Sequence, residues 1–320
     1  MKKILYINSS SERCGVSEYG RRIKHIISKS KKYKIIYKEV KDSNNIGFII
    51  NLYKPDLCLY NYHCMTLGNL EYTIANNKLC KHIVIYHEFG MTSKSHDAII
   101  SVNSDMKDDE ANKVFSIPRP LLSMNLNKSE NSTVKIGTYG FLSHDKNIES
   151  TVDKIIEDFD EAILNFNFPI NSHEYDLSIR NNIISSIKNK IFNSKKKLTL
   201  NITDNYFNSQ QLIEFLNEND LNIFSNKDRD GNVAFGTYRT GFDLALSATT
   251  DYALMSKKPF ALSKSNMFRH FESVFPSIYY EDRRLNEIME SGFDPFESIL
   301  DNNNEKKFLD KFEFIMDKFI

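Results

Sequence analysis

Apolar, β-branched runs alternate along the chain with segments whose apolar residues recur every three or four positions. The first run is residues 2–8, and the segment after it places Tyr19, Ile23 and Ile27 on one helical face, with Ser17 as the predicted N-cap. Similar strand-like runs follow at 33–40, 56–62, 82–89 and 98–103. Strands of this composition separated by helices indicate a parallel sheet covered on both faces.

The same pattern restarts in the second half of the chain. A strand is predicted at 134–141 and a helix at 147–159. Further strands are predicted at 197–203, 221–226 and 259–264, and further helices at 208–220 and 243–256. The second half therefore repeats the α/β organisation of the first.

The fold class expected from this repetition is α/β, with two Rossmann-like, doubly wound domains that face a cleft. The segment "SIPRPLLSMNLNKSENST" between the halves has two prolines and a polar run typical of a linker. We predict an N-terminal domain at 1–122 and a C-terminal domain at 133–303. An amphipathic helix at about 304–320 completes the chain, and the first domain is one surface on which it could pack. Ligands of such sheets bind outside the carboxyl ends of the strands.

The composition is that of an ordinary soluble globular protein, with 320 residues, 41% hydrophobic and 26% charged. No apolar run approaches the roughly 20 residues of a membrane-spanning helix, and the run after Lys3 is too short for a signal peptide. The sequence contains four cysteines, which are Cys14, Cys58, Cys64 and Cys80. Their spacing matches neither a CxxC motif nor a zinc-binding pattern. We therefore expect reduced thiols, no metal ion and a cytoplasmic location.

The net charge is zero, but it is unevenly distributed. Residues 1–120 contain 19 Lys and Arg against 12 Asp and Glu, and the other 200 residues contain 23 basic against 30 acidic groups. Solvated helix faces such as "SKSKKYK" are one explanation, and an N-terminal half that meets an anionic partner is the other. In the second case the protein would lie at the periphery of a membrane or act on DNA.

The stretch "KIGTYGFLSHDKNIE" (135–149) has the pattern of a buried strand, a turn at Gly140 and a helix whose entrance carries Lys146. Free N–H groups at a helix start attract phosphate, and a nearby cation adds fixed positive charge. Arg239 precedes the predicted helix 243–256 in a comparable way. These residues are candidates for binding a diphosphate without a metal ion. The alternative for Lys146 is an exposed lysine on a helix shoulder.

The order of the segments resembles that of two-domain glycosyltransferases of the GT-B fold, and most closely the large retaining family GT4. The likeness rests on five stretches of sequence, which are "RCGVSEYG", "IVIYHEFG", "IGTYGFLSHDKNIE", "TDNYFNSQQLIEFLNENDLNIF" and "GTYRTGFDLALSATTDYALMSKKPFAL". It implies a metal-independent transfer of a sugar from a nucleotide-diphosphate sugar, such as a UDP-sugar, to a hydroxyl acceptor. No cofactor besides this co-substrate is implied.

The resemblance also implies roles for residues of the first half. Gly15 would let the backbone approach the donor closely, with a simple turn glycine as the alternative. His87 would hydrogen-bond the sugar or support charge that develops at its anomeric carbon. A histidine held only by packing at a strand end is the alternative. Glu88 beside it would be the acceptor base.

In the second half, the resemblance implies that Gly140, Lys146 and Arg239 meet the donor diphosphate. Three further donor-binding candidates are Thr249, Thr250 and Asp251, for which surface polar positions on a helix are the alternative.

The family's two glutamates, spaced eight positions apart in the last segment, are absent from this sequence. Tyr252 occupies the position of the glutamate that contacts the ribose, and Asp251 is next to it. This departure favours a second function, that of a non-catalytic nucleotide-sugar-binding protein. The acceptor of a catalytic protein stays open between a glycan, a glycolipid and a hydroxymethylated base in phage-type DNA.

Overall fold

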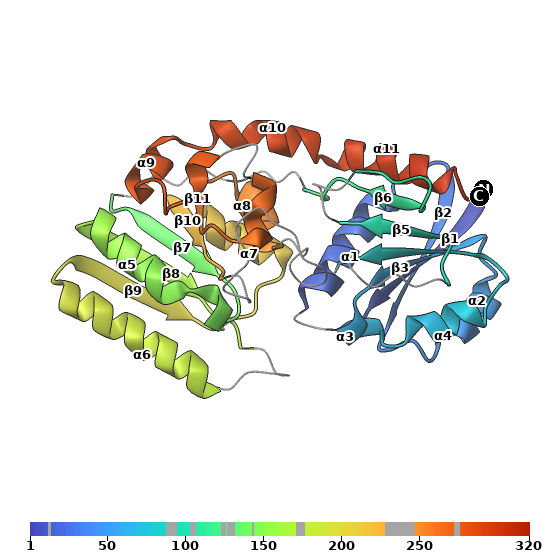
Figure 1. Cartoon of the computed structure of the whole chain (residues 1–320), viewed down its shortest axis with the longest axis horizontal. Helices are drawn as coiled ribbons and strands as arrows, with labels where there is room; N and C mark the ends of the chain where they lie inside the picture. The colour runs from blue at the N-terminus through green and yellow to red at the C-terminus, as the bar shows by residue number, and fades with distance from the viewer. Residues whose placement is uncertain are drawn as a thin grey trace. The chain divides into compact units, whose positions relative to one another are not determined.

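The computed structural model describes residues 1–320 except 12–13, 88–94, 103–106, 123–125, 127–131, 143, 171–176, 228–246 and 272–275. The described chain forms two compact units (Figure 1). One unit contains Met1–Ser123 together with Asp301–Ile320, and the other contains the described residues between them. None of the helices in the described chain combines the length and apolar character that crossing a bilayer requires.

The first unit is built on a parallel sheet whose described strands have the order β2-β1-β3-β4-β5-β6. The strands are β1 (Lys2–Ser9), β2 (Tyr33–Val40), β3 (Leu57–Tyr62), β4 (Lys81–Tyr86), β5 (Ala98–Ser101) and β6 (Val114–Ser116). The helices are α1 (Gly15–Ile27), α2 (Ile46–Tyr53), α3 (Cys64–Leu67), α4 (Leu70–Ala75) and α11 (Glu305–Met316). Because β2 and β3 flank β1, the order of strands reverses between β1 and β3.

Alternate residues of these strands enter two different cores. In β1, Ile4 and Tyr6 face a cluster shared with α1 and α11, whereas Leu5 and Ile7 face a cluster shared with α2, α3 and α4. This period of two is the geometry of a pleated strand buried on both faces. The α/β class predicted from the sequence is confirmed for this unit.

The helix α1 begins at Gly15, with Cys14 as its N-cap residue. The prediction that Ser17 caps this helix is therefore wrong, since Ser17 is buried within the first turn. The apolar face was located correctly, because Tyr19, Ile23 and Ile27 are all buried.

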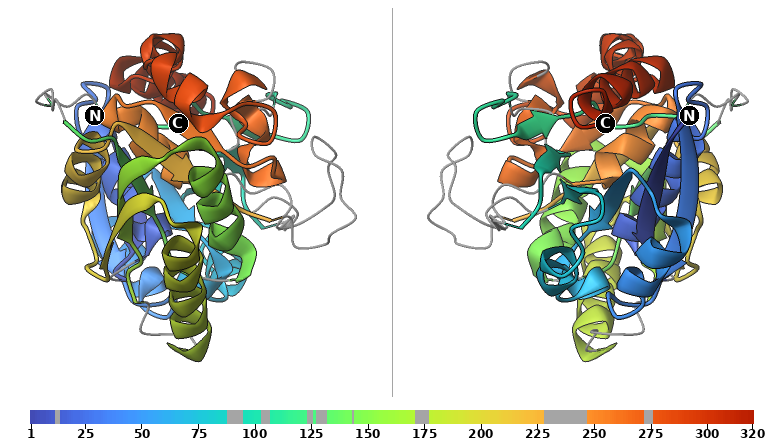
Figure 2. Two further views of the ribbon diagram at one scale, coloured as in Figure 1. Left: turned by 90° about the vertical axis from the view of Figure 1, so that its left-hand side faces the viewer. Right: turned by 90° about the vertical axis from the view of Figure 1, so that its right-hand side faces the viewer.

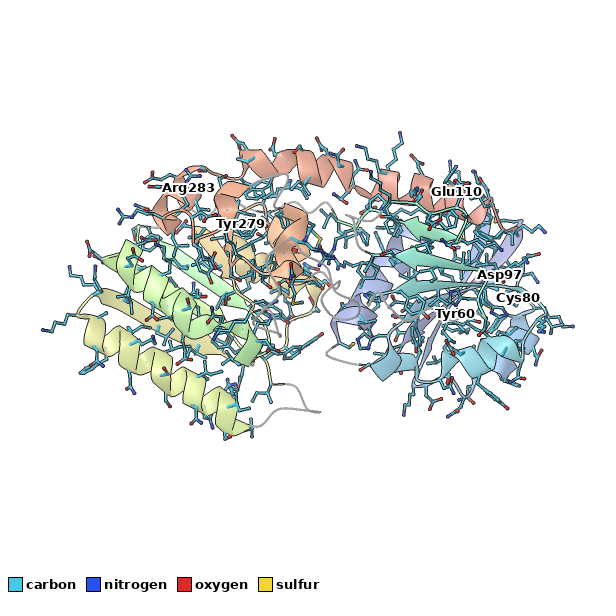
Figure 3. The ribbon with its side chains drawn as sticks, viewed as in Figure 1. Tyr60, Cys80, Asp97, Glu110, Tyr279 and Arg283 are labelled. Carbon is cyan, nitrogen blue, oxygen red and sulfur yellow. The ribbon has the colours of Figure 1, made fainter. Side chains whose placement is uncertain are left out.

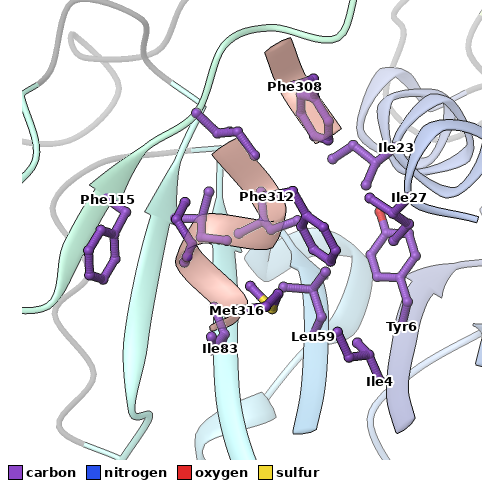
Figure 4. Close-up of a cluster of buried hydrophobic side chains, with 14 of the residues drawn as sticks. Ile4, Tyr6, Ile23, Ile27, Leu59, Ile83, Phe115, Phe308, Phe312 and Met316 are labelled. Carbon is purple, nitrogen blue, oxygen red and sulfur yellow. The ribbon is translucent and has the colours of Figure 1, made fainter. Parts of the chain in front are cut away.

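The C-terminal helix α11 completes the core of the first unit. Phe308, Phe312 and Met316 are buried in the cluster that also contains Ile23 and Ile27 of α1 (Figure 4). Burying two phenylalanine side chains of this kind stabilises a fold by several kcal/mol, on the order of 2–3 kcal/mol each. The last helix is thus a structural part of the first sheet's covering layer.

Part of the basic segment "SKSKKYK" is paired with α11 and the residue after it. Lys32 forms ion pairs with Glu313 at 3.6 Å and with Asp317 at 2.8 Å, and Lys29 pairs with Glu305. These two lysines therefore have acidic partners within the same unit. Exposed pairs of this type contribute little stability individually, on the order of 0–1 kcal/mol.

The segment predicted as a linker starts inside the first unit. Ile117, Arg119 and Leu121 are 2%, 6% and 3% exposed. Arg22 of α1 donates a hydrogen bond to the carbonyl of Pro120 at 3.5 Å. The two prolines thus lie in a mostly buried stretch, and residues 117–121 of the segment predicted as a linker belong to the first unit.

The second unit has a parallel sheet whose described strands have the order β11-β10-β7-β8-β9. The strands are β7 (Lys135–Tyr139), β8 (Glu161–Asn167), β9 (Lys197–Thr203), β10 (Leu221–Phe224) and β11 (Phe260–Leu262). The α-helices are α5 (Ile148–Asp158), α6 (Leu177–Ser194), α7 (Ser209–Asn217), α8 (Thr249–Ser256), α9 (Leu285–Glu290) and α10 (Asp294–Asn302), the last of which ends in the first unit. Short 3₁₀ turns are η1 (His144–Lys146), η3 (Asn266–Phe271) and η4 (Pro276–Ile278).

The helices α5 and α6 lie side by side on one face of the second sheet (Figures 1 and 2). Their buried residues, such as Ile155 and Ile187, join a cluster with Leu164 and Phe166 of β8. Ladder pairing is parallel throughout this sheet in the described chain, with β7 between β8 and β10. The order of strands therefore reverses between β7 and β10, and the predicted α/β class is confirmed here as well.

Candidate functional site

The reversal point of the second sheet is where a doubly wound α/β sheet offers a ligand site at the carboxyl ends of its strands. Gly140 directly follows β7, and Lys146 ends the turn η1 that leads into α5. The backbone of this turn is fixed to the end of β10, because the Ser225 hydroxyl donates to the carbonyl of Lys146. The amide of Lys227 donates to the carbonyl of Asp145 at 2.6 Å. Lys146 is thus held between the two strands that flank the reversal point.

The ammonium group of Lys146 is taken out of water. Burial lowers the pKa of Lys146 to about 8, against the opposing effect of the neighbouring carboxylate of Asp145. No ion pair or hydrogen bond of this ammonium group is found among the described residues. The side chain is only partly exposed, so the alternative of a solvated lysine on a helix shoulder is wrong. A desolvated cation without a carboxylate within 4 Å in the described chain is suited to binding an anion.

Gly140 lies beside this side chain. Its φ angle is +146°, a conformation that residues with a side chain rarely adopt. A Cβ atom at this position would lie 3.5 Å from Cε and 3.7 Å from Nζ of Lys146, which is ordinary van der Waals contact. The backbone conformation at the end of β7, and not a lack of space beside the lysine, therefore favours glycine here.

The ends of β10 and β11 are tied together beside this turn. Ser263 Oγ accepts a hydrogen bond from the amide of Asn226 at 2.8 Å and donates to the carbonyl of Asn226 at 2.9 Å. Ser225, Asn226 and Ser263 are all at most 4% exposed. Sequence reasoning did not select these residues, although each lies at the carboxyl end of a predicted strand.

The start of α8 contains the three other donor-binding candidates. Thr250 and Asp251 are 0% and 1% exposed, so the alternative that they are surface polar groups is wrong. The Thr250 hydroxyl donates to the carbonyl of Ser247 at 3.0 Å, and the hydroxyls of Ser247 and Thr249 lie 2.5 Å apart. This first turn is therefore polar and rigid, which is the kind of helix start that binds phosphate.

In the first unit, two asparagines mark the reversal point between β1 and β3. Asn8 and Asn61 are both fully buried, and Asn61 Nδ2 donates to Asn8 Oδ1 at 2.8 Å and to the carbonyl of Val16 at 2.7 Å. Asn8 Nδ2 in turn donates to the carbonyl of Ser17 at 3.0 Å. This network connects the ends of both strands to the first turn of α1.

His87 follows β4 and reaches the same network. Its Nε2 lies 2.7 Å from Asn61 Oδ1. The side-chain orientation of Asn61 is fixed by the hydrogen bonds of its Nδ2, so Oδ1 faces His87, and this oxygen can only accept a hydrogen bond. Nε2 therefore carries the proton, and Nδ1 has the lone pair. Burial lowers the pKa of His87 to about 3, with smaller contributions from His63, Arg119 and Arg22. The ring is therefore neutral at physiological pH. It also packs edge-on against the ring of Tyr19, with 4.9 Å between the two ring centroids.

A glycine that sequence reasoning missed controls the packing of α1. A Cβ atom at Gly20 would lie 2.3 Å from Asn8 Oδ1 and 2.6 Å from Asn61 Nδ2. A Cβ atom at Gly15, the predicted close-approach position, would meet nothing within 4 Å. Within this unit Gly20 is thus the close-approach glycine, and a role of Gly15 toward a donor stays a prediction. Both belong to the stretch "CGVSEYG", which was the available signal.

Two further buried cations surround His87 in the first unit. Arg22 and Arg119 are 3% and 6% exposed, and both help to lower its pKa. Sequence reasoning missed them, because Arg119 was assigned to the linker and nothing in the sequence around Arg22 distinguishes it from an exposed helix residue. Arg239 and Glu88, the other predicted catalytic residues, lie outside the described residues.

Comparison by sequence gives no matching family model and no matching curated protein. Comparison by structure gives clear matches. One is sucrose-phosphate synthase from Thermosynechococcus elongatus, with a TM-score of 0.66, 10% sequence identity and 99% of each chain covered. Another is the lipopolysaccharide outer core galactosyltransferase WaaB, with a TM-score of 0.62, 11% identity and 99% of each chain covered. A third is Anabaena HepE in complex with UDP, with a TM-score of 0.58, 10% identity, and 99% of this chain and 100% of HepE covered. This chain has the GT-B fold.

The match extends to longer proteins, since the chain covers 60% of a chain in the GtfA/B complex, with 86% of its own length aligned (TM-score 0.52, 9% identity). At identities near one tenth, these similarities establish the fold and do not carry over individual residues. The resemblance to GT-B glycosyltransferases inferred from the sequence motifs is nevertheless confirmed at the level of fold.

Proposed function

We propose that this chain is a glycosyltransferase that moves a sugar from a nucleoside-diphosphate sugar, with UDP as the preferred nucleotide, to a hydroxyl acceptor. The fold is that of a galactosyltransferase and of a protein crystallised with UDP. The observation that carries the proposal is the buried ammonium group of Lys146 at the reversal point of the second sheet. A diphosphate is the ligand class that such a cation beside a polar helix start recognises.

The reaction breaks the bond between the anomeric carbon and the diphosphate oxygen. The acceptor oxygen forms the new bond to that carbon, and its proton leaves to a phosphate oxygen. Negative charge grows on the departing diphosphate, so fixed positive charge lowers the barrier. Lys146 supplies that charge, and the first turn of α8, with Thr249 and Thr250, supplies amide dipoles. We assign a retaining outcome by analogy with family GT4.

His87 has a different role in this proposal. Because its ring is neutral, it does not stabilise charge as an imidazolium ion. Its Nδ1 atom accepts a hydrogen bond from a sugar hydroxyl, while Asn61 holds the opposite nitrogen in place. Of the two roles considered for His87, we therefore favour hydrogen bonding over charge support.

Removal of the Lys146 charge tests the catalytic proposal. Lys146→Met keeps the aliphatic stem and should reduce turnover by about 10²–10³-fold, the usual effect of losing one charge-stabilising group. Lys188→Ala, an exposed lysine on α6, is the matched control and should leave turnover unchanged. The assay is release of UDP from UDP-sugars in the presence of acceptor sugars. Equal rates in the Lys146→Met variant and the wild type would contradict the assignment.

The proposed mechanism uses no divalent ion at the diphosphate, because Lys146 and the helix start provide the compensating charge. Turnover should be the same, within about twofold, with and without added Mg²⁺ or Mn²⁺. A strict requirement for either ion would overturn this part of the proposal and indicate carboxylate ligands.

The absence of the glutamate pair supports a second candidate function, that of a nucleotide-sugar-binding protein without catalysis. Asp251 and Tyr252 occupy this part of α8, and both are buried. The two functions differ in donor hydrolysis. A transferase releases sugar slowly to water even without an acceptor, whereas a pure binding protein releases none.

For the acceptor we propose a hydroxyl of a glycan or glycolipid. Lys29 and Lys32, part of the basic surplus of the N-terminal half, have intramolecular partners, which weakens the argument for a polyanionic acceptor. Duplex DNA containing hydroxymethylated cytosine is the competing acceptor. Transfer to that DNA, falling steeply with salt, would replace our assignment.

A further inference from the structure

Three potential metal ligands converge at the amino ends of β3 and β4 in the first unit. Cys58 and His82 are directly paired across these strands, and Cys80 precedes His82 by two residues. Cys80 lies just before β4, and its Sγ is near both Cys58 Sγ and His82 Nε2, so all three side chains lie on the same side of the sheet. The cysteines were predicted to show no metal-binding spacing, and the ligand set indeed arises only from strand pairing.

Two of the three distances among these side chains are close to those of tetrahedral zinc coordination. Cys58 Sγ and Cys80 Sγ are 3.4 Å apart, Cys80 Sγ and His82 Nε2 are 3.9 Å apart, and all three ligand atoms lie within 4.8 Å of one another. With Zn–S bonds of about 2.3 Å and Zn–N bonds of about 2.0–2.1 Å, tetrahedral angles require separations of about 3.8 and 3.6 Å. Adjustments of a few tenths of an ångström would bring two of the three pairs to these values.

The neighbouring groups fit a metal-binding histidine. The Tyr60 hydroxyl lies 2.8 Å from His82 Nδ1 (Figure 3 labels Tyr60 and Cys80). With a metal ion on Nε2, Nδ1 would carry the proton and donate it to the Tyr60 oxygen, which fixes the ring. In the metal-free chain Nε2 instead contacts the carbonyl of Asn77. Metal binding would therefore replace this contact, and the ring proton would move from Nε2 to Nδ1.

The cluster has an access route from solvent. A surface groove of about 830 Å³ is lined in part by Asn77, Cys80, His82 and Asp97. Water that enters this groove supplies the fourth ligand in a four-coordinate site.

A disulfide between the two cysteines is the less suitable product. Cys58 is opposite His82 on the parallel strand β4, so Cys80 is in a diagonal position. In a regular ladder, one strand spacing of about 4.8 Å and two residues of about 3.3 Å each separate such Cα atoms by about 8 Å. A disulfide closes without backbone movement only at Cα separations of about 4.4–6.8 Å. A bridging ion spans the longer separation, because it adds two metal–sulfur bonds between the side chains.

We propose that Cys58, Cys80 and His82 bind one zinc ion at the amino-terminal edge of the first sheet. The ion would join β3 to β4 and to the turn before β4. It would lie at the amino ends of the strands, whereas Asn61 and His87 lie at their carboxyl ends. Its role would therefore be structural. Thiolate and imidazole ligands favour zinc over the harder ions magnesium and calcium.

The test uses the untagged full-length protein, stripped of metal and titrated with Co²⁺ as a spectroscopic probe and then with Zn²⁺. We expect one equivalent of cobalt with a thiolate-to-metal charge-transfer band and tetrahedral ligand-field bands, displaced by zinc. Cys58→Ser and Cys80→Ser should weaken cobalt binding at least tenfold. Cys14→Ser, a free cysteine outside the cluster, is the control. The proposal would be overturned if the wild type showed no charge-transfer band with cobalt. It would also be overturned if the band were unchanged in both Cys58→Ser and Cys80→Ser.

A second measurement applies if the serine variants fail to fold. Zinc should protect Cys58 and Cys80 of the wild type from alkylation by iodoacetamide at least tenfold, as mapped by mass spectrometry, while Cys14 stays equally reactive. Equal alkylation of the two cluster cysteines with and without zinc would contradict the proposal. A Cys58–Cys80 disulfide that persists in metal-free and zinc-treated protein would do so as well.

Discussion

At the residue scale, Lys146 shows how a position that we propose for binding can reduce the stability of the unliganded fold. Its pKa of about 8 lies below the 10.5 of an unperturbed lysine, because burial disfavours the charged form. The folded protein therefore carries an unfavourable charge at pH 7. A bound diphosphate would remove that disadvantage.

Replacing Lys146 by methionine should stabilise the unliganded protein by about 1–3 kcal/mol at pH 7. Between pH 8 and 10.5 the unfolded state binds more protons than the folded state, so the wild type gains stability as the pH rises through this window. The advantage of the variant should therefore shrink above pH 8. Urea unfolding of both proteins at pH 7, 8 and 9 measures this difference in the free energy of unfolding. A variant that is less stable than the wild type at pH 7 would show that the ammonium group has a stabilising partner.

His87 predicts a different pH dependence. Its folded pKa of about 3 is below the unperturbed value of 6.5, so between these values the unfolded state binds more protons. The free energy of unfolding should fall as the pH drops below 6.5. Relative to His87→Gln, the wild type should lose about 2 kcal/mol between pH 7 and 5. Thermal or urea unfolding of both proteins measures this, and parallel pH profiles would refute the buried neutral histidine.

Two glycines of α1 form a matched pair for a packing test. Gly20→Ala should destabilise the protein by about 1–3 kcal/mol or more, because its Cβ overlaps Asn8 and Asn61. Gly15→Ala should change stability by less than about 1 kcal/mol, in the stabilising direction, since alanine favours the helix and meets no neighbour. Urea unfolding ranks the two variants. The reverse order would mean that the Asn8–Asn61 network does not hold α1.

The sequence identified those site residues that follow a strand in a readable motif. Lys146 and His87 were selected because each comes shortly after an apolar run. Gly20 and Arg119 were missed, because their importance depends on contacts across the fold. Cys58 and His82 were missed for the same reason, since only strand register makes them neighbours.

At the element scale, α11 is a long-range part of the first unit's core. Phe312→Ala should cost about 3–5 kcal/mol, as expected for a fully buried phenylalanine. Phe314→Ala on the same helix, where the ring is 48% exposed, should cost less than about 1 kcal/mol. Equilibrium unfolding of both variants makes the comparison. Equal effects would show that α11 is not docked on α1.

Strand prediction from periodicity succeeded where apolar residues were β-branched and flanked by polar turns. The strands at 33–40 and 197–203 have the predicted bounds. The strand β8 was missed because Ile155, Phe159 and Ala162 keep a spacing of three to four residues from the helix into the strand. The helical period thus hides the point where α5 ends. The helix α6 was not predicted either. The strand β6 was not predicted because its three residues are too few to show a period.

At the scale of the whole molecule, one chain contains two parallel sheets with different strand orders. In both, polar residues of interest lie where the order of strands reverses, the buried Asn8 and Asn61 in one unit and the half-buried Lys146 in the other. This recurrence follows from the geometry of doubly wound sheets, in which the reversal leaves the strand ends uncovered. The alternation of strands and helices was sufficient to predict this architecture.

The central claim is that the second unit binds a nucleoside diphosphate through Lys146. Isothermal titration of UDP into the wild type, Lys146→Met and Lys188→Ala tests it most directly. We expect the methionine variant to bind UDP at least tenfold more weakly, about 1.4 kcal/mol or more, while the wild type and Lys188→Ala agree within twofold. Equal affinities for all three proteins, or no UDP binding by the wild type, would contradict the account.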